Sequence, residues 1–278
     1  MSPQAVRYKP ATLRIFMRVL AIILALLTGA ASAQDSALVT LQTRNDSRGW
    51  EGVGRLDILD KGFCTAALIQ SKLILTAAHC LYDNDGTLIS PDRFVFEAGL
   101  RDGRAEATRG VSRILAHPDY DHQGPSTDTS EVANDIAILE LDQPIRNGRI
   151  FPYAIAATPQ SGDLIGVVSY GRDRANAASL QEECEVIERQ QGVILMSCDI
   201  AFGSSGSPVF TIQDGSPKIV SVVSAMADVD GKQISIGTSL QEPLAELLST
   251  FQTASTGTGR KIVIGGQRTD TGAKFVKP

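Results

Sequence analysis

Residues 53–80 read VGRLDILDKGFCTAALIQSKLILTAAHC, in which short apolar runs alternate with segments that contain Asp, Gly, Lys and Ser. Similar runs continue as far as residue 240. Most of them are rich in β-branched residues or alternate in polarity, and their spacing is near the ~8–12 residues typical of a β-sandwich or barrel. The sequence therefore predicts an all-β chain.

A few segments do not follow this pattern. EPLAELLSTF (242–251) carries apolar residues at helical intervals after an early proline, which predicts a C-terminal helix. ASLQEECEVIERQ (178–190) fits a helix or a strand, and the choice stays open. The polar loop DHQGPSTDTSEVAN (121–134) is expected on the surface. The basic tail, residues 251–278, is expected to be disordered or to add one strand at 261–264.

The N-terminus has the pattern of a secretory signal peptide, residues 1–33. Four basic residues precede the apolar run VLAIILALL (19–27), and Ala31-Ser32-Ala33 matches an A-x-A cleavage site. The alternative is a membrane anchor, which needs ~20 apolar residues to span a bilayer. We therefore expect a secreted or periplasmic protein that has no membrane contact after cleavage.

Charge and composition narrow the classes of partner. Without residues 1–33, the chain keeps 22 Lys and Arg against 31 Asp and Glu, a net charge of −9. Nucleic-acid binding needs a basic surface, so a nucleic-acid partner is not expected. The composition is ordinary for a globular protein, with 43% hydrophobic and 21% charged residues. We expect a soluble monomer.

The four cysteines, Cys64, Cys80, Cys184 and Cys198, predict two disulfides in an exported chain. Three connectivities can be drawn, and we favour the local pairs, Cys64–Cys80 and Cys184–Cys198. A zinc site is the alternative, but the cysteines form no close C-x-x-C pairs and the chain has only three histidines. No metal is expected. Of the histidines, His117 is explained by a turn at HPDY, and His122 should be solvated.

Three motifs supply a His, an Asp and a Ser in that order. LTAAHC (75–80) puts His79 after a strand-like run, where a histidine taken alone is more often structural. NDIAILEL (134–141) contains Asp135, whose carboxylate, once buried, needs a partner such as a histidine ring N–H. In GSSGSP (203–208), the glycines let the backbone turn sharply around the serines. The N–H groups of Gly203 and Ser205 could then converge on one oxyanion.

With these motifs in this order, the chain resembles the chymotrypsin/trypsin-like serine peptidases from about residue 50 to 250. The resemblance implies a chymotrypsin-like fold of two antiparallel Greek-key β-barrels, with the active site between them. We expect a peptidase domain over 34–250, with barrel one at about 50–143 and barrel two at about 159–250.

The same resemblance assigns roles to the motif residues. It implies His79 as general base and acid, Asp135 as its orienting partner and Ser205 as nucleophile. The N–H groups of Gly203 and Ser205 would form the oxyanion hole. Where family members activated by zymogen cleavage carry an aspartate, this chain has Ser204, so the ion pair of that activation is not expected. In this it is closer to secreted bacterial relatives, including the glutamyl endopeptidase branch with its G-x-S-G-S-P signature.

Substrate specificity does not follow from these motifs. By the same alignment the substrate-binding residues are Asp199, Ile200, Ser224, Ala225 and Met226. Asp199 stands where trypsins carry the aspartate that binds Arg or Lys, but Ile200 and Met226 argue against that preference. The alternative is that Asp199 is a buried framework acid bonded to backbone N–H groups.

The function expected is that of an exported serine endopeptidase, which hydrolyses protein or peptide substrates through an acyl-enzyme. No cofactor, metal or organic, is required, and activity should fall at acidic pH because a protonated imidazole cannot act as a base. Two alternatives stay open: a non-catalytic binding protein on the same scaffold, and an esterase that uses the same three residues.

Overall fold

The computed structural model describes residues 35–122, 129–229 and 231–256. The expected signal peptide (1–33) and the expected strand at 261–264 lie outside the described residues. Within the described part of the chain, no helix is long and apolar enough to cross a membrane.

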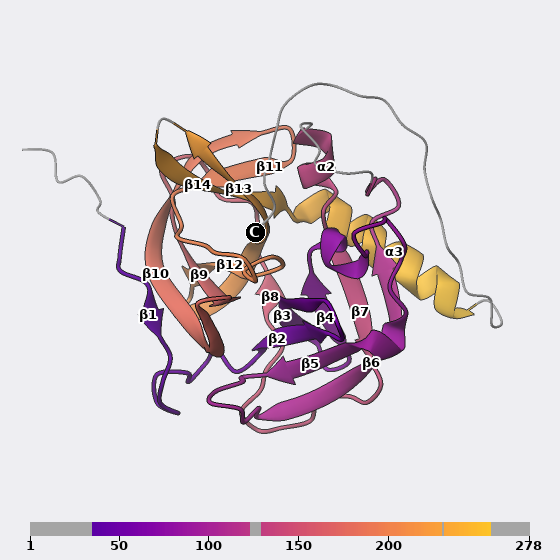
Figure 1. Ribbon diagram of the computed structural model, residues 1–278. Helices are drawn as coiled ribbons and strands as arrows, with labels where there is room; N and C mark the ends of the chain where they lie inside the picture. The colour runs from indigo at the N-terminus through magenta and orange to yellow at the C-terminus, as the bar shows by residue number, and fades with distance from the viewer. Residues whose placement is uncertain (1–34, 123–128, 230, 257–278) are drawn as a thin grey trace, which may run out of the picture. The chain divides into compact units, whose positions relative to one another are not determined.

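Six antiparallel strands close the first barrel in the order β2-β3-β4-β7-β6-β5 (Figure 1). Their bounds are β2 Val53–Ile58, β3 Gly62–Gln70, β4 Leu73–Thr76, β5 Phe94–Ala98, β6 Ala107–Ala116 and β7 Ala137–Leu141. In β2 the sequence alternates, so Leu56 is buried while its neighbours Arg55 and Asp57 are half-buried. Leu56 and Ile58 of β2 thus contribute to the buried core, whereas all four residues of β4 are buried.

The second group of strands also closes on itself. Antiparallel pairings run from β9 through β10, β11, β14, β13 and β12 back to β9. The bounds are β9 Leu164–Gly171, β10 Arg174–Gln190, β11 Val193–Met196, β12 Pro208–Gln213, β13 Ser216–Val229 and β14 Lys232–Ser239. Two short strands join this group: β1 (Val39–Thr40) pairs with β10, and β8 (Ala154–Ile155) pairs in parallel with β13. The segment 178–190, left open above, belongs to strand β10.

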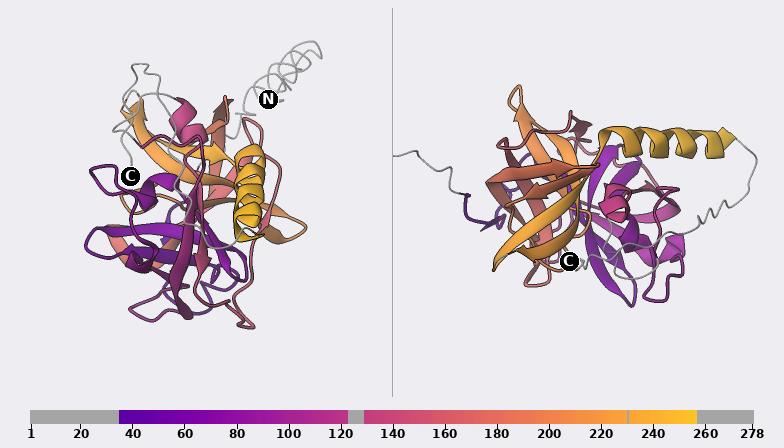
Figure 2. Two further views of the ribbon diagram at one scale, coloured as in Figure 1. Left: turned by 90° about the vertical axis from the view of Figure 1, so that its right-hand side faces the viewer. Right: turned by 90° about the horizontal axis from the view of Figure 1, so that it is seen from above.

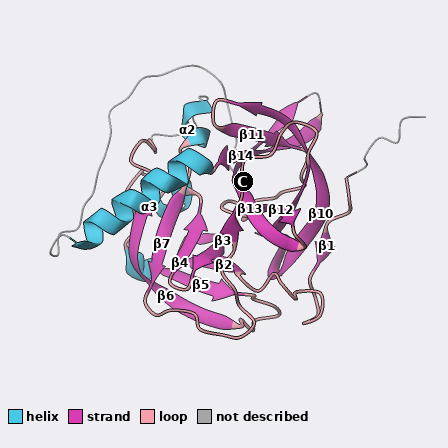
Figure 3. Cartoon of the chain, turned by 180° about the vertical axis from the view of Figure 1, so that it is seen from behind, coloured by secondary structure: helices cyan, strands magenta, loops and turns pink. Residues whose placement is uncertain are grey.

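Helices are few in the described chain. Helix α3 (Gln241–Thr256) contacts β6 and β7 and is longer than the predicted 242–251 (Figure 3). The short helix α2 (Thr129–Ala133) ends the loop 121–134 and buries Val132, so this end of the loop is not a surface segment as expected. Two 3-10 turns, η1 (Ala78–Leu81) and η2 (Pro91–Arg93), complete the list of elements.

The views of Figure 2 show the strands of the two barrels side by side, with α3 following them in the chain. Tyr170 of β9 is buried between them, and its hydroxyl donates to the carbonyl of Leu100 at 2.9 Å. The prediction of an all-β chain with two antiparallel barrels and a C-terminal helix is confirmed.

Candidate active site

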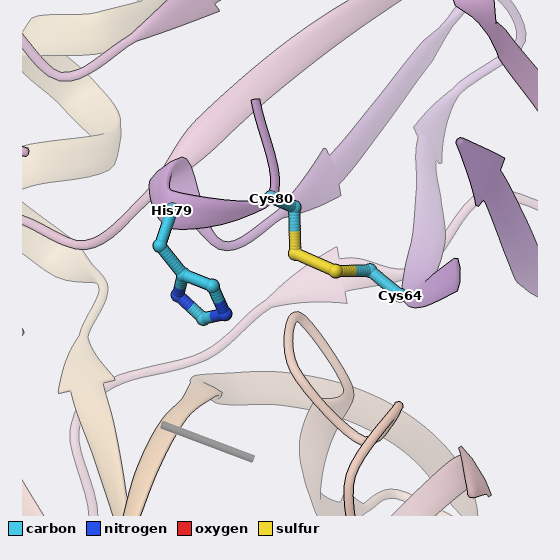
Figure 4. Close-up of side chains that lie close together, drawn as sticks. All are labelled: Cys64, His79 and Cys80. Atoms are coloured by element: carbon cyan, nitrogen blue, oxygen red, sulfur yellow. A yellow bond between two sulfur atoms is a disulfide. The ribbon is translucent and has the colours of Figure 1, made fainter. Parts of the chain in front are cut away.

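His79 lies on η1, directly after strand β4. Its neighbour Cys80 is joined to Cys64 of β3 by a disulfide, which fastens this turn to the barrel (Figure 4). The second disulfide joins Cys184 and Cys198, so the favoured local pairing is confirmed. The sulfurs of Cys64 and Cys80 lie near the His79 ring, but they are bonded to each other and are not thiolates that could bind a metal.

Asp135 is 1% exposed and accepts hydrogen bonds from the elements around it. Oδ1 accepts from the backbone N–H of His79 at 2.8 Å, and Oδ2 lies 2.7 Å from His79 Nδ1. The hydroxyl of Ser224 donates to Oδ2 as well. The buried carboxylate is therefore compensated by donors, as a buried charge requires.

This contact determines how the His79 ring can act. A carboxylate only accepts, so Nδ1 carries the proton and the lone pair stands on Nε2. Nε2 is buried and has no hydrogen-bond partner among the described residues. The ring is thereby held in the tautomer that can take a proton at Nε2.

The serine turn, residues 201–207, connects the Cys184–Cys198 disulfide to strand β12. Ser205 is 1% exposed within it. Gly203 and Gly206 both have positive φ, +98° and +79°. A Cβ at Gly206 would lie 2.0 Å from Thr76 Oγ1 and 2.3 Å from the carbonyl oxygen of Thr65. Only glycine fits this close approach of the turn to the first barrel.

Backbone hydrogen bonds orient the two expected oxyanion donors. The N–H groups of Gly203 and Ser205 belong to the peptides that follow Phe202 and Ser204. The Phe202 carbonyl accepts from the N–H of Arg172 at 2.7 Å, and the Ser204 carbonyl accepts from Ser207 at 3.0 Å. In a trans peptide the C=O and N–H point in opposite directions, so each bond fixes the direction of the following N–H. The N–H of Gly203 donates to no described residue.

Ser204 is fully buried, and two backbone groups and one arginine contact its hydroxyl. Its hydroxyl donates to the Tyr170 carbonyl at 3.2 Å and accepts from the N–H of Ala201 at 3.2 Å. Arg174 Nη2 lies 3.4 Å from the same oxygen. Hydrogen bonds therefore hold the position that an aspartate fills in zymogen-activated relatives.

The five expected substrate-binding residues do not share one environment. Asp199 is exposed, so the alternative of a buried framework acid is wrong; its backbone N–H, not its carboxylate, is bonded, to Gln181 Oε1 at 2.7 Å. Ile200 is 2% exposed and packs in the apolar cluster of the second barrel. Ser224 turns its hydroxyl to Asp135, as described above.

Met226 is half-buried, and Ala225 is buried in a separate small cluster with Val132 and Ile236. Gln233 was not foreseen from the sequence. Its Nε2 donates to the Ile200 carbonyl at 3.1 Å and lies 3.0 Å from Met226 Sδ. No motif marks this residue, because it lies in an ordinary strand-like run.

The other two histidines lie apart from this constellation. His117 is buried, and the N–H of Tyr120 donates to its carbonyl at 3.0 Å, as the expected turn requires. His122 is half-buried and stacks on Tyr82 with ring centroids 4.8 Å apart, so the expectation of a solvated ring is wrong. Neither was assigned a catalytic role.

Comparisons with known proteins agree with this arrangement. A family model described as Trypsin matches residues 39–242. Human mannan-binding lectin serine protease 1 is 33% identical over 121 residues, 38% of this chain and 16% of that protein. Mouse cathepsin G is 32% identical over 113 residues, 39% of each chain. The match thus spans less than two thirds of the length of these relatives.

A solved structure of Glu endopeptidase in complex with MPD is similar in fold. It superposes with a TM-score of 0.62 at 18% sequence identity, over 80% of this chain and 98% of that one. At this identity the likeness shows the fold alone.

Proposed function

Because the chain belongs to the trypsin family, we propose that it is an exported serine endopeptidase with His79, Asp135 and Ser205 as its catalytic residues. The observation that carries the proposal is the 2.7 Å contact between His79 Nδ1 and Asp135 Oδ2, with Nε2 of the same ring unpartnered among the described residues. An imidazole held in this way can act as a general base and accept a proton at Nε2. In this family the donor is a serine hydroxyl.

The reaction proposed is acyl transfer. Ser205 Oγ attacks the peptide carbonyl carbon as its proton passes to His79 Nε2, and the carbonyl π electrons move to the oxygen. The proton on Nε2 then goes to the leaving amine as the C–N bond breaks. Water repeats these steps on the acyl-enzyme and restores the serine hydroxyl.

The negative oxygen formed in each half-reaction is assigned to the N–H groups of Gly203 and Ser205. Each such donor contributes roughly 3–4 kcal/mol to the transition state in a comparable enzyme. The bonds to the Phe202 and Ser204 carbonyls support this assignment, since they hold both peptides in place before substrate arrives. No metal or organic cofactor takes part in these steps.

The cellular context is proposed from the N-terminal sequence. Residues 1–33 act as a signal peptide, and the exported monomer carries the peptidase domain at 34–250. Disulfides Cys64–Cys80 and Cys184–Cys198 fit an oxidising compartment outside the cytoplasm. N-terminal sequencing of the exported protein should begin at Gln34.

A fluorophosphonate probe tests the enzymatic proposal. The probe should label the wild-type protein and leave Ser205→Ala unlabelled, and a diverse peptide library should be cleaved by the wild type only. A folded, processed protein that takes no label is not a serine hydrolase, and the non-catalytic alternative then stands. Labelling with hydrolysis of esters but of no peptide would point to an esterase.

A further inference from the structure

Residues 35–41, here called the strap, lie along the edge of strand β10. Strand β1, which is part of the strap, pairs with β10 in antiparallel register, with Val39 opposite Leu180. The N–H of Ser36 donates to the Glu183 carbonyl at 2.8 Å, and the N–H of Leu41 donates to Ala178 at 2.8 Å. Both ends of the strap are thus hydrogen-bonded to β10.

Gln181 of β10 connects the strap to the chain that precedes the serine turn. The residue is 3% exposed. Its Nε2 donates to the carbonyl of Ser36 at 3.0 Å, and its Oε1 accepts from the N–H of Asp199 at 2.7 Å. A carbonyl only accepts and a backbone N–H only donates, so both ends of the amide are determined by these partners.

Each of residues 197–199 is bonded to another segment of the protein. The hydroxyl of Ser197 donates to Asp35 Oδ1 at 2.8 Å, which is a second bond to the strap. Cys198 is joined to β10 by its disulfide, and Asp199 is held by Gln181. The next residues form the serine turn, where Ala201 donates to Ser204 Oγ. Whatever moves residues 197–199 therefore acts on the turn that carries both oxyanion donors.

We propose that Gln181 is a positioning residue, through which the docked strap holds the serine turn in its active geometry. The inference rests on the proposed function and adds a structural element that regulates the same site. If the strap left β10, the buried Nε2 of Gln181 would lose its acceptor and Asp35 would lose Ser197, and a buried donor without a partner is unfavourable. Arg174 and Thr65 contact the turn itself, at Ser204 and Gly203, and do not contact residues 197–199. Docking of the strap thus sets the rate of acylation.

The test compares rates of fluorophosphonate labelling in the mature protein. Gln181→Met keeps the length of the side chain and removes both hydrogen bonds, and we expect about a tenfold slower labelling rate. On a peptide substrate kcat should fall by a similar factor and KM should change less. Asp35→Ala, which breaks the other bond to residues 197–199, should slow labelling in the same direction and is exposed enough to fold normally.

Thr40→Val is the matched control. It removes the contact between Thr40 Oγ1 and Ser179 Oγ, which belongs to the strap but has no link to residues 197–199. We expect the wild-type labelling rate and an unchanged melting temperature. Equal slowing in Thr40→Val would mean that the strap acts through general stability, and it would overturn the role of Gln181.

Two further outcomes are decisive. A wild-type rate in folded Gln181→Met overturns the inference, whatever the rate of Asp35→Ala, while the proposed function stands. Absence of labelling in the wild type removes the proposed function and with it the inference. Should Gln181→Met fail to fold, Gln181→Glu takes its place, because it keeps the acceptor for the Asp199 N–H and removes only the donor to the Ser36 carbonyl; a wild-type labelling rate in that variant overturns the inference.

Discussion

The side-chain hydroxyl of Thr65 donates to the carbonyl of Gly203 at 3.0 Å and so joins the first barrel to the serine turn. The same hydroxyl accepts from the backbone N–H of Tyr170 at 3.1 Å, and the N–H of Thr65 donates to the Ser205 carbonyl at 2.8 Å. Thr65 is fully buried. One residue of β3 therefore positions the turn from the barrel that carries His79 and Asp135.

Replacing this threonine should weaken both stability and catalysis. Thr65→Val keeps the shape and the β-branching but leaves the Gly203 carbonyl and the Tyr170 N–H buried without their partner. We expect the free energy of unfolding to fall by about 1–3 kcal/mol in urea denaturation. The value of kcat should fall about tenfold, since the serine turn loses a restraint.

Thr65→Ser is the control for this change, because it keeps a hydroxyl at the same place. It should retain most of the activity. A Thr65→Val protein with wild-type kcat would show that the bond to Gly203 is only structural.

Replacing Asp135 should lower kcat far more than replacing Thr65. In Asp135→Asn an amide replaces one oxygen, so the side chain no longer favours the proton on His79 Nδ1. We expect kcat to drop by a factor on the order of 10⁴ while the protein stays folded, as measured on a peptide substrate and by circular dichroism. Ser224→Ala removes only one donor to the same carboxylate and should cost about tenfold. Full activity of Asp135→Asn would refute the proposed set of catalytic residues.

Local sequence patterns predicted the features of this molecule that are formed by residues close together in the sequence. Alternating apolar runs predicted the strands, and helical spacing predicted α3. The motifs around His79 and Asp135 indicated two side chains that the structure does bring together. The local pairing of the cysteines was likewise found.

Long-range polar contacts escaped prediction for a physical reason. Thr65 meets Gly203 across 138 positions of the chain, and Gln181 meets Ser36 across 145. A single polar residue in a strand has no period and no motif, so its partner depends on how the sheets pack. Whether Asp199 is exposed or buried stayed open for the same reason, since the segment around it is placed by Gln181 and the disulfide.

Acid should destabilise the protein through His117. Burial lowers the pKa of this ring, and the nearby carboxylates of Glu246 and Asp119 oppose that effect only in part. The unfolded ring has the ordinary pKa of about 6.5, so it binds protons before the folded one does. Stability from this residue is therefore present above about pH 6.5 and is lost as the pH falls below it.

Urea denaturation at a series of pH values measures this effect. His117→Asn keeps an acceptor for the N–H of Asp119, which lies 3.3 Å from His117 Nδ1, and should flatten the dependence of stability on pH below 6.5. Glu246→Gln removes the carboxylate 3.7 Å from Nε2, and it should steepen the same dependence. Equal slopes in all three proteins would contradict the assignment.

Gly206 gives the sharpest test of the serine turn's geometry. Gly206 and Gly215 both have positive φ, +79° and +70°, so alanine strains the backbone at either site by ~1 kcal/mol or more. They differ in their surroundings. A Cβ at Gly206 would overlap Thr76 and Thr65, whereas a Cβ at Gly215 would have no atom within 4 Å.

The difference between the two losses in unfolding free energy therefore measures the steric overlap at Gly206. We expect Gly215→Ala to lower the free energy of unfolding by about 1 kcal/mol and to leave kcat unchanged. Gly206→Ala should lower it by several kcal/mol more, because the contacting atoms include backbone that cannot move aside. It should also abolish fluorophosphonate labelling at temperatures where the protein is still folded, since the displaced turn carries Ser205. Equal losses of stability in the two variants would mean that the turn does not press against the first barrel.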